Sequence, residues 1–261
     1  MCYRLETLRY DRAMFETVKV AYVLTMETSS RRGQYLKQLD TFRPCRTVHI
    51  QHNKGYKACE KALCHDEPCY DLAHAYYTAM RHAPPEGKVM FLEDDFMFLD
   101  EVTTEDVARI EDFDRPYDLY NLGPFAIASV PVNAFHVRLL KWTCAHALIL
   151  SAGCREAYLT QFEANACRIR HIDVYLSKFI CYAYHRPLAV QRFEATENAA
   201  ASWGTNTGIK PFDRFTNRSL FAFTRWLRLD KDPERGFHLA SITSVMLVPL
   251  ILMVLVFFSA R

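Results

Sequence analysis

The sequence lacks an excess of charge of either sign. Its 32 Lys and Arg residues balance 30 Asp and Glu residues, which leaves a formal net charge of +2 over 261 residues. This composition gives no indication of a nucleic-acid partner. Internal repeats and low-complexity segments are also absent, and half of the residues are hydrophobic. The length therefore predicts one large globular domain or two small ones with a sizeable core.

The amino end lacks the apolar centre of a signal peptide, because residues 2–20 carry charges throughout. The nine cysteines also lack closely spaced pairs. Cys59, Cys64 and Cys69 recur every five residues around His65, whereas structural zinc sites favour two-residue spacings. An odd number of cysteines without a signal peptide predicts free thiols in a reducing compartment, with a zinc site at the three cysteines as the less favoured alternative.

One long hydrophobic run lies near the carboxyl end. Residues 239–260 include no charged residue. As a helix that rises about 1.5 Å per residue, they would cross a hydrocarbon core about 30 Å thick, and Pro249 can kink such a helix without preventing it from spanning. We expect a single-pass, carboxyl-terminal membrane anchor, with a buried core helix as the alternative. The expected organisation is a loose or weakly helical leader (1–18), a main domain (19–219), a basic neck (220–238) and a transmembrane helix (239–260).

Short apolar runs alternate with helical patterns along the main domain. Strands are predicted at residues 19–25, 46–51, 88–92, 117–122, 144–150 and 188–191. Helical spacing occurs at residues 31–40, 71–81 and 153–165, and a further helix begins at residues 171–173. Strands that alternate with helices indicate an α/β fold with a mostly parallel central sheet.

Three adjacent carboxylates, Glu93, Asp94 and Asp95, follow the predicted buried strand at residues 88–92. Adjacent acids repel one another and require solvent or a cation. At the carboxyl end of a parallel strand they would face the crevice where open α/β sheets bind ligands. Oxygen ligands of this kind suit Mg²⁺ or Mn²⁺ together with substrate phosphates. The cluster predicts a divalent-metal site, with a solvated acidic turn as the alternative.

Five short segments, taken in their order along the chain, carry a resemblance to a known family. They are Ser30-Arg31-Arg32 after the first strand, FLEDD at residues 91–95, DLYNLG at 118–123, AHALILS at 145–151 and IDVYL at 172–176. Over residues 20–204 the chain resembles glycosyltransferase family 25, the lipooligosaccharide and collagen galactosyltransferase type, including family 25-like proteins of large DNA viruses. It departs from the family where Thr25-Met26-Glu27 replaces Asn-Leu-Asp and where His171 replaces a common proline. The resemblance implies a GT-A-like nucleotide-diphospho-sugar transferase fold.

The resemblance also implies a metal-dependent, inverting hexosyltransferase. The domain over residues 19–219 would move a sugar from a nucleotide-diphosphate donor, UDP-galactose or UDP-glucose, to a glycan or protein acceptor. Asp95 would bind Mn²⁺ or Mg²⁺, with Glu93 and His185 as further ligands. Cofactor-binding contacts to the ribose, base or diphosphate would come from the following residues: Glu93, Asp94, Arg32 and Thr25.

Direct displacement at the sugar also needs a base that takes the proton of the acceptor hydroxyl. Asp173 is the candidate base, because it lies at the start of a predicted helix within a family-like segment; helix N-capping is its alternative role. His146 and Trp203 are candidates for the acceptor side. A core histidine and a packed loop residue are the respective alternatives.

Two other functional classes stay open from the sequence. The acidic cluster would equally serve a metal-dependent phosphoryl or nucleotidyl transferase, and the fold could also persist in a catalytically silent, membrane-tethered adaptor. Positive residues precede the apolar run, which favours a cytoplasmic catalytic domain; these are Arg225, Arg228, Lys231 and Arg235, against Arg261 after it. The glycosylation sequon Asn217-Arg218-Ser219 argues for the opposite side.

Overall fold

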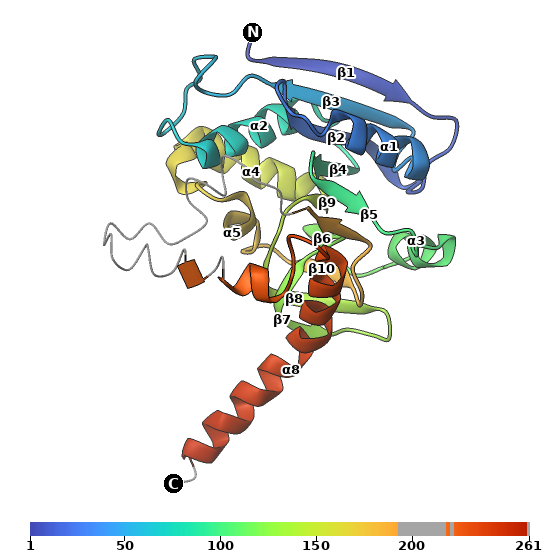
Figure 1. The fold of residues 1–261 in the computed structure, drawn as a ribbon, viewed down its shortest axis with the longest axis vertical. Helices are drawn as coiled ribbons and strands as arrows, with labels where there is room; N and C mark the ends of the chain where they lie inside the picture. Colours follow the sequence, from blue (N-terminus) through green and yellow to red (C-terminus); the bar gives the residue numbers. More distant parts are fainter. Residues whose placement is uncertain (193–217, 220–221, 260–261) are drawn as a thin grey trace.

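The computed structural model describes residues 1–192, 218–219 and 222–259. Its strands are β1 (Tyr3–Arg9), β2 (Val18–Met26), β3 (Thr47–Asn53), β4 (Lys88–Glu93), β5 (Phe96–Phe98), β6 (Leu119–Asn121), β7 (Phe125–Pro131), β8 (His136–Thr143), β9 (Ala147–Leu150), β10 (Cys181–Tyr184) and β11 (Ala189–Gln191). Its helical elements are α1 (Arg32–Phe42), α2 (Pro68–His82), α3 (Thr104–Glu111), α4 (Ala152–Asn165), the 3-10 turn η1 (Ala166–Arg168), α5 (Ile172–Leu176) and α8 (Pro233–Ser259) (Figure 1).

Nine strands form one mixed sheet in the order β1-β3-β2-β4-β9-β6-β10-β8-β7, and β5 and β11 form a separate two-stranded sheet. Three neighbouring pairs are parallel (β2–β3, β2–β4, β6–β10), and the other five pairs of the large sheet are antiparallel. The α/β class is confirmed, but the prediction of a mostly parallel sheet is wrong. β9 follows the β7–β8 hairpin without a crossover helix and enters between β4 and β6 in the opposite direction. A parallel pairing would need such a crossover.

Both faces of the middle of the sheet are covered. Along β4, Val89 and Phe91 pack in one core with residues of α2 and α4, whereas Met90 and Leu92 pack in a second core with residues of α1 and α3. Successive side chains of a strand point to opposite faces, so a strand buried on both faces is apolar throughout. This is why the run at residues 88–92 is continuous and why its polar continuation emerges at the end of the strand.

The amino-terminal segment is not the loose or weakly helical leader that we expected. It contains β1, an edge strand that pairs with β3 in antiparallel register from Tyr3 opposite Asn53 to Arg9 opposite Thr47. Side chains of β1 are half-buried or exposed, because an edge strand with one packed face buries little. Its sequence therefore carries too weak an apolar pattern to identify it as a strand.

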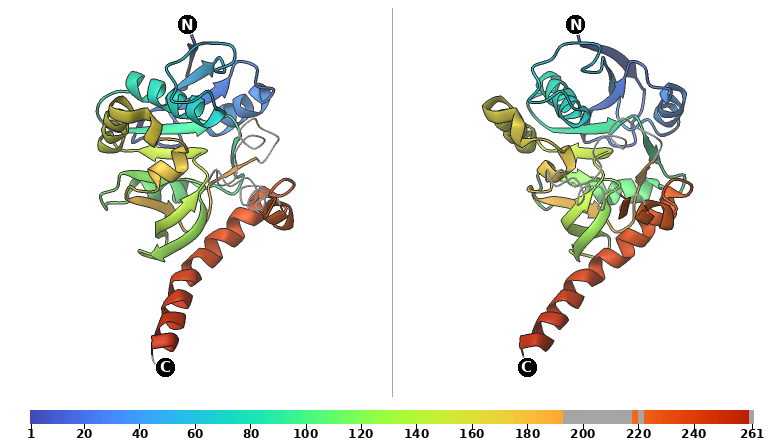
Figure 2. Two further views of the ribbon diagram at one scale, coloured as in Figure 1. Left: turned by 90° about the vertical axis from the view of Figure 1, so that its left-hand side faces the viewer. Right: turned by 60° about the vertical axis from the view of Figure 1, so that its left-hand side comes forward.

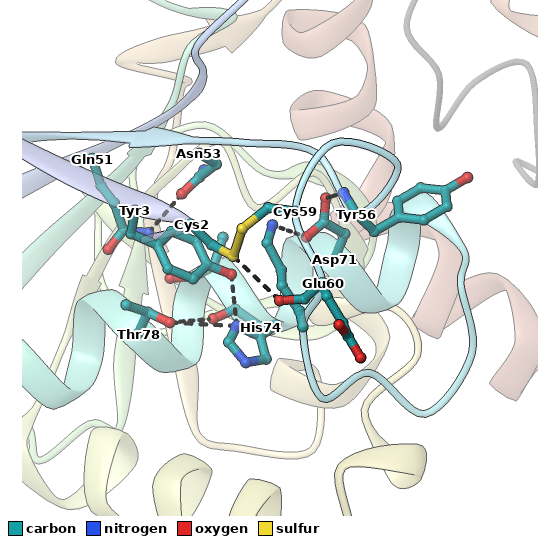
Figure 3. Close-up of polar contacts among 12 residues, drawn as sticks. Cys2, Tyr3, Gln51, Asn53, Tyr56, Cys59, Glu60, Asp71, His74 and Thr78 are labelled. Carbon is teal, nitrogen blue, oxygen red and sulfur yellow. Dashed lines mark hydrogen bonds and ion pairs between the residues drawn. A yellow bond between two sulfur atoms is a disulfide. The ribbon is translucent and has the colours of Figure 1, made fainter.

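Two disulfides hold the loop over residues 54–67, which follows β3. Cys59 is bonded to Cys2 and Cys64 to Cys167. Between the two cysteines of the loop, Lys61 forms a buried ion pair with Asp71 of α2, and Asp71 Oδ2 also accepts the Tyr56 N–H (Figure 3). The expectation of free thiols is therefore wrong for these four cysteines. The remaining cysteines of the chain are free: Cys45, Cys69, Cys144, Cys154 and Cys181.

The last helix, α8, begins beside the domain and runs away from it (Figures 1 and 2). Phe237, Ala240 and Ser244 are buried against the domain, whereas all residues from 249 to 259 are exposed. The helix is long and apolar enough to cross a membrane. The expected apolar carboxyl-terminal helix is thus present, and its first turns pack on the domain.

Candidate active site at the ends of strands β2 and β4

The acidic cluster lies where two neighbouring parallel strands end. β2 and β4 pair in register, with Leu24 opposite Glu93, so the next residue of each strand comes to the same edge of the sheet. There the Thr25 hydroxyl donates a hydrogen bond to Asp94 Oδ2 at 2.8 Å. Thr25, expected among the cofactor-binding residues, therefore lies beside the acids because of the strand register.

Arg31, rather than Arg32, is the cation of this cluster. Arg31 Nη1 lies 2.8 Å from Asp94 Oδ1, and both side chains are largely buried, with 13% and 11% exposed. Arg32 turns the other way and donates two hydrogen bonds to Glu6 of β1, at 2.9 and 3.1 Å. Arg31 is the N-cap of α1 and Arg32 is its first helical residue, and their side chains reach different acids. The predicted donor contact of Arg32 is not supported by this position.

Glu93 accepts a hydrogen bond from α2, but its burial and its acidic neighbours favour its protonated form. The Tyr76 hydroxyl of α2 donates to Glu93 Oε1 at 3.0 Å and also lies 3.1 Å from the carbonyl oxygen of Ala145. Burial, followed by the negative charge of Asp95, raises the pKa of Glu93 to about 8. The protonated form of Glu93 is therefore favoured relative to that of an ordinary glutamate.

Asp95 has one carboxylate oxygen that accepts a hydrogen bond and one that has no partner within the described part of the chain. Gln191 of β11 donates to Asp95 Oδ2 at 2.9 Å, and the backbone N–H of Arg192 donates to the Asp95 carbonyl at 3.0 Å. Asp95 is 6% exposed, and its Oδ1 has no hydrogen-bond partner among the described residues. Burial raises the pKa of Asp95 to about 6. An unsatisfied buried carboxylate oxygen is costly, and a bound cation would remove that cost.

Asp173 approaches the cluster from α5. The N-cap of α5 is His171, so Asp173 lies at the second helical position and does not take the alternative role of N-cap. Asp173 Oδ1 accepts the Val174 N–H at 2.8 Å. Its negative charge is one of the smaller causes of the raised pKa of Glu93, so Asp173 lies within electrostatic range of Glu93. The structure therefore brings Asp173 to the same side of the domain as the acids.

Two predicted histidines take other positions. His185 follows β10, which is three places from β4 in the sheet, about 14 Å at roughly 4.8 Å per strand. Its Nδ1 lies 3.3 Å from the Phe135 carbonyl oxygen. His146 is completely buried, packs edge-on against Phe237 and has its pKa lowered to about 3 by burial. The structure thus places His146 in the core and does not bring His185 to the acids, and Trp203 lies outside the described residues.

The sequence interpretation missed three residues that contact the acids: Arg31, Tyr76 and Gln191. Gln191 ends a predicted strand and Tyr76 lies on the buried side of a predicted helix, but neither pattern shows which strand end the side chain will reach. Among the described residues, no three His, Cys, Asp or Glu side chains are placed together as ligands of one metal ion. Asp94 is paired with Arg31, so the acids that could contact a cation are Asp95 and Glu93.

No protein-family model matches the chain, and a comparison with curated proteins gives no match. Two carboxylates with raised pKa and an ion-paired third carboxylate lie at the end of β4, and a fourth, on α5, lies within electrostatic range of Glu93. Such an arrangement can bind a divalent cation with an anionic ligand and can place a carboxylate beside it as a base.

Proposed function

We propose that this chain is a membrane-tethered, metal-dependent glycosyltransferase, which moves a hexose from a nucleotide-diphosphate sugar to a glycan or protein acceptor. The observation that carries the proposal is the buried, unpartnered Oδ1 of Asp95 within the acidic cluster at the ends of β2 and β4. The order of family-like segments along the sequence supports the choice of sugar transfer among the reactions that use such a cluster. UDP-galactose and UDP-glucose are the proposed donors.

The residues present suit Mn²⁺ or Mg²⁺. Mg²⁺ is commonly held by one or two protein carboxylates together with waters and substrate phosphates, so a preformed cage of three side chains is not required. Asp95 would hold the ion through its unpartnered oxygen, with Glu93 as the second ligand after it loses its proton. When bound, the ion neutralises charge that develops on the leaving diphosphate.

The remaining side chains have roles that follow from their contacts. Arg31 compensates the charge of Asp94 and brings a fixed positive charge to the place where a diphosphate would bind. Asp173 takes the proton of the acceptor hydroxyl, since it approaches the cluster from a separate element. Tyr76 and Gln191 orient Glu93 and Asp95 by donating one hydrogen bond to each. The helix α8 anchors the domain in a membrane.

The proposal is tested by thermal unfolding of the full chain in detergent or nanodiscs, with UDP, UDP-galactose and UDP-glucose, each with and without Mn²⁺. A ligand at a hundred times its Kd stabilises the folded state by about 2.7 kcal/mol. We expect a metal-dependent rise in melting temperature for the parent chain and none for Asp95→Asn. Asp95→Asn should also lower sugar transfer on the order of a hundredfold or more.

Asp114→Asn is the matched control, because Asp114 is an exposed aspartate outside the cluster. It should keep both the metal-dependent shift and the activity. Nucleotide binding without release of the sugar would favour a phosphoryl or nucleotidyl transferase. If no nucleotide shifted the melting temperature, the silent adaptor would be favoured. If Asp95→Asn kept the metal-dependent shift and the activity of the parent chain, Asp95 would not belong to the site.

A further inference from the structure

The first turns of α8 are apolar enough to lie in lipid, yet they also pack on the domain. The helix carries its last charged residue at Arg235 and is apolar enough to lie in lipid from about residue 239 onward. Packing on the domain nevertheless continues to Ser244, whose hydroxyl oxygen lies 2.7 Å from that of Ser129 on β7. The segment suited to lipid and the segment packed on the domain therefore overlap by about six residues, or about 9 Å of helix.

The outward side of this overlapping segment carries exposed apolar side chains. Leu239 is 43% exposed and Ile242 is 66% exposed, at the level where Ala240 and Ser244 pack on the domain. These exposed residues differ from the buried face of the same turns, which contacts β7 through Ser129 and Phe125. If α8 spans a bilayer, these turns lie at the membrane surface, and the strand that packs on them lies there too.

β7 and its partner β8 carry exposed apolar side chains at that place. Ile127 and Val130, on either side of Ser129, are 40% and 39% exposed, and Leu140 on β8 is 46% exposed. Figures 1 and 2 show the β7–β8 hairpin extending along the first half of α8, at the end of the sheet opposite β1. Exposed apolar side chains gathered beside an apolar helix mark a surface for lipid or protein.

The charges around these side chains favour the headgroup boundary of a bilayer. Arg138 and Lys141 on β8 are exposed, and basic residues interact favourably with lipid headgroups. Trp226, next to Phe223, is 74% exposed, and Trp is enriched at membrane interfaces. β7 is the last strand of the sheet, so its outer backbone groups are unpaired within the sheet and cannot enter hydrocarbon. The contact must therefore be shallow.

We infer that the β7–β8 edge, through Ile127, Val130 and Leu140, rests in the interfacial layer of a phospholipid bilayer, so that the domain lies against the membrane. The inference rests on the proposed membrane anchor and is independent of the proposed sugar transfer. It gives the domain one orientation toward the membrane, with β1 at the far end of the sheet.

The test uses the full chain in liposomes that contain lipids brominated either near the headgroup or deep in the acyl chain. Ile127→Trp and Leu140→Trp each add an emitting side chain at the proposed contact. Leu5→Trp on β1 is the matched control, because Leu5 is an apolar residue of similar exposure, 39%, on the opposite edge strand. Lipids brominated near the headgroup should quench most of the tryptophan fluorescence added at residues 127 and 140, and lipids brominated deep in the acyl chain should quench less of it. Neither lipid should quench the fluorescence added at residue 5.

Flotation of each variant with the liposomes separates the two proposals. If the parent chain does not float, the membrane anchor itself is wrong and the inference falls with it. If the chains float but the added emission at residues 127 and 140 behaves like that at residue 5, the anchor stands and the docked edge is wrong. A dimer that covers residues 127 and 140 in the liposomes, detected by cross-linking, would also overturn the inference.

Discussion

At the residue scale, Glu93 makes the strongest prediction, because its raised pKa links the cluster to stability. The folded chain binds the Glu93 proton more tightly than the unfolded chain does, so stability from this group is present below pH 4.5 and is lost as the pH rises toward about 8. Asp95 acts in the same direction between its ordinary pKa of 3.8 and about 6. The melting temperature of the chelator-treated protein should therefore contain a component that falls from pH 5 to pH 8.

Glu93→Gln should remove part of that fall, since the amide oxygen still accepts the Tyr76 hydrogen bond but no longer titrates. Glu156→Gln, at an exposed position on α4, should keep the slope of the parent chain. Mn²⁺ should stabilise the parent more at pH 8 than at pH 6, because metal binding must displace the Glu93 proton. Identical slopes for Glu93→Gln and the parent would show that Glu93 does not titrate in this range.

Asp173 makes a second prediction at this scale. Asp173→Asn keeps an oxygen that can accept the Val174 N–H, so the fold should lose no more than about 1 kcal/mol, the usual size of a charge effect in the first turn of a helix. If Asp173 is the base, transfer should be abolished while the stabilisation by donor and Mn²⁺ is kept, because the base acts on the acceptor. Melting temperature and turnover of the same sample decide. Full turnover by the variant would assign the base to another residue.

The position of the three acids at the end of a buried strand was predicted correctly, because it depends on one strand, whereas the metal site expected there stays a prediction. A buried run that ends in three carboxylates needs only its own pattern to be recognised, and β4 ends at Glu93. The neighbours of the cluster depend on three-dimensional packing. The choice between Arg31 and Arg32 depends on the rotation of α1, and the distance of His185 depends on two strands that lie between β4 and β10. Neither property is encoded in local spacing.

At the scale of secondary structure elements, the same distinction explains the errors in the fold. The predicted central strands and helices all occur, because each has its own apolar period. Five strands were missed. β1, β7 and β8 lie at or next to the two edges of the sheet, where exposed side chains obscure the alternation. β5 and β10 have only three and four residues, too few to show a period. The direction of β9 was missed because it depends on the hairpin that precedes it rather than on its own residues.

The disulfide between Cys64 and Cys167 gives a prediction at this scale. It joins the loop after β3 to the segment that leads into α5, across a sequence separation of 103 residues. Replacing both cysteines by serine should reduce the free energy of unfolding by about 2–4 kcal/mol, the usual contribution of a disulfide. Cys69→Ser is the control, because Cys69 is a buried thiol outside both disulfides. Denaturant unfolding of the full chain measures the difference. Equal loss in the control would show that the effect comes from removing a thiol side chain.

At the scale of the whole molecule, the disulfides bear on which side of the membrane the domain faces. The expectation of a cytoplasmic domain used two arguments, unpaired cysteines and the positive residues before α8. The first argument is removed by the two disulfides, which persist in oxidising compartments and rarely in the cytosol. The second is a statistical bias in the charge of short flanking segments, and it acts during insertion rather than on the folded domain.

The last prediction follows from giving the disulfides the greater weight. In sealed microsomes that carry the full chain, the domain should be protected from added protease and become digestible only after detergent is added. The sequon at Asn217 should then carry a glycan, which Asn217→Gln removes, since glycan transfer to such sequons occurs in the compartment where disulfides form. Intact mass after alkylation without reductant should show five reactive thiols under denaturing conditions, and nine after reduction. Digestion of the domain in intact microsomes, with nine thiols alkylated without reductant, would instead place it in the cytoplasm, as the charge distribution alone suggests.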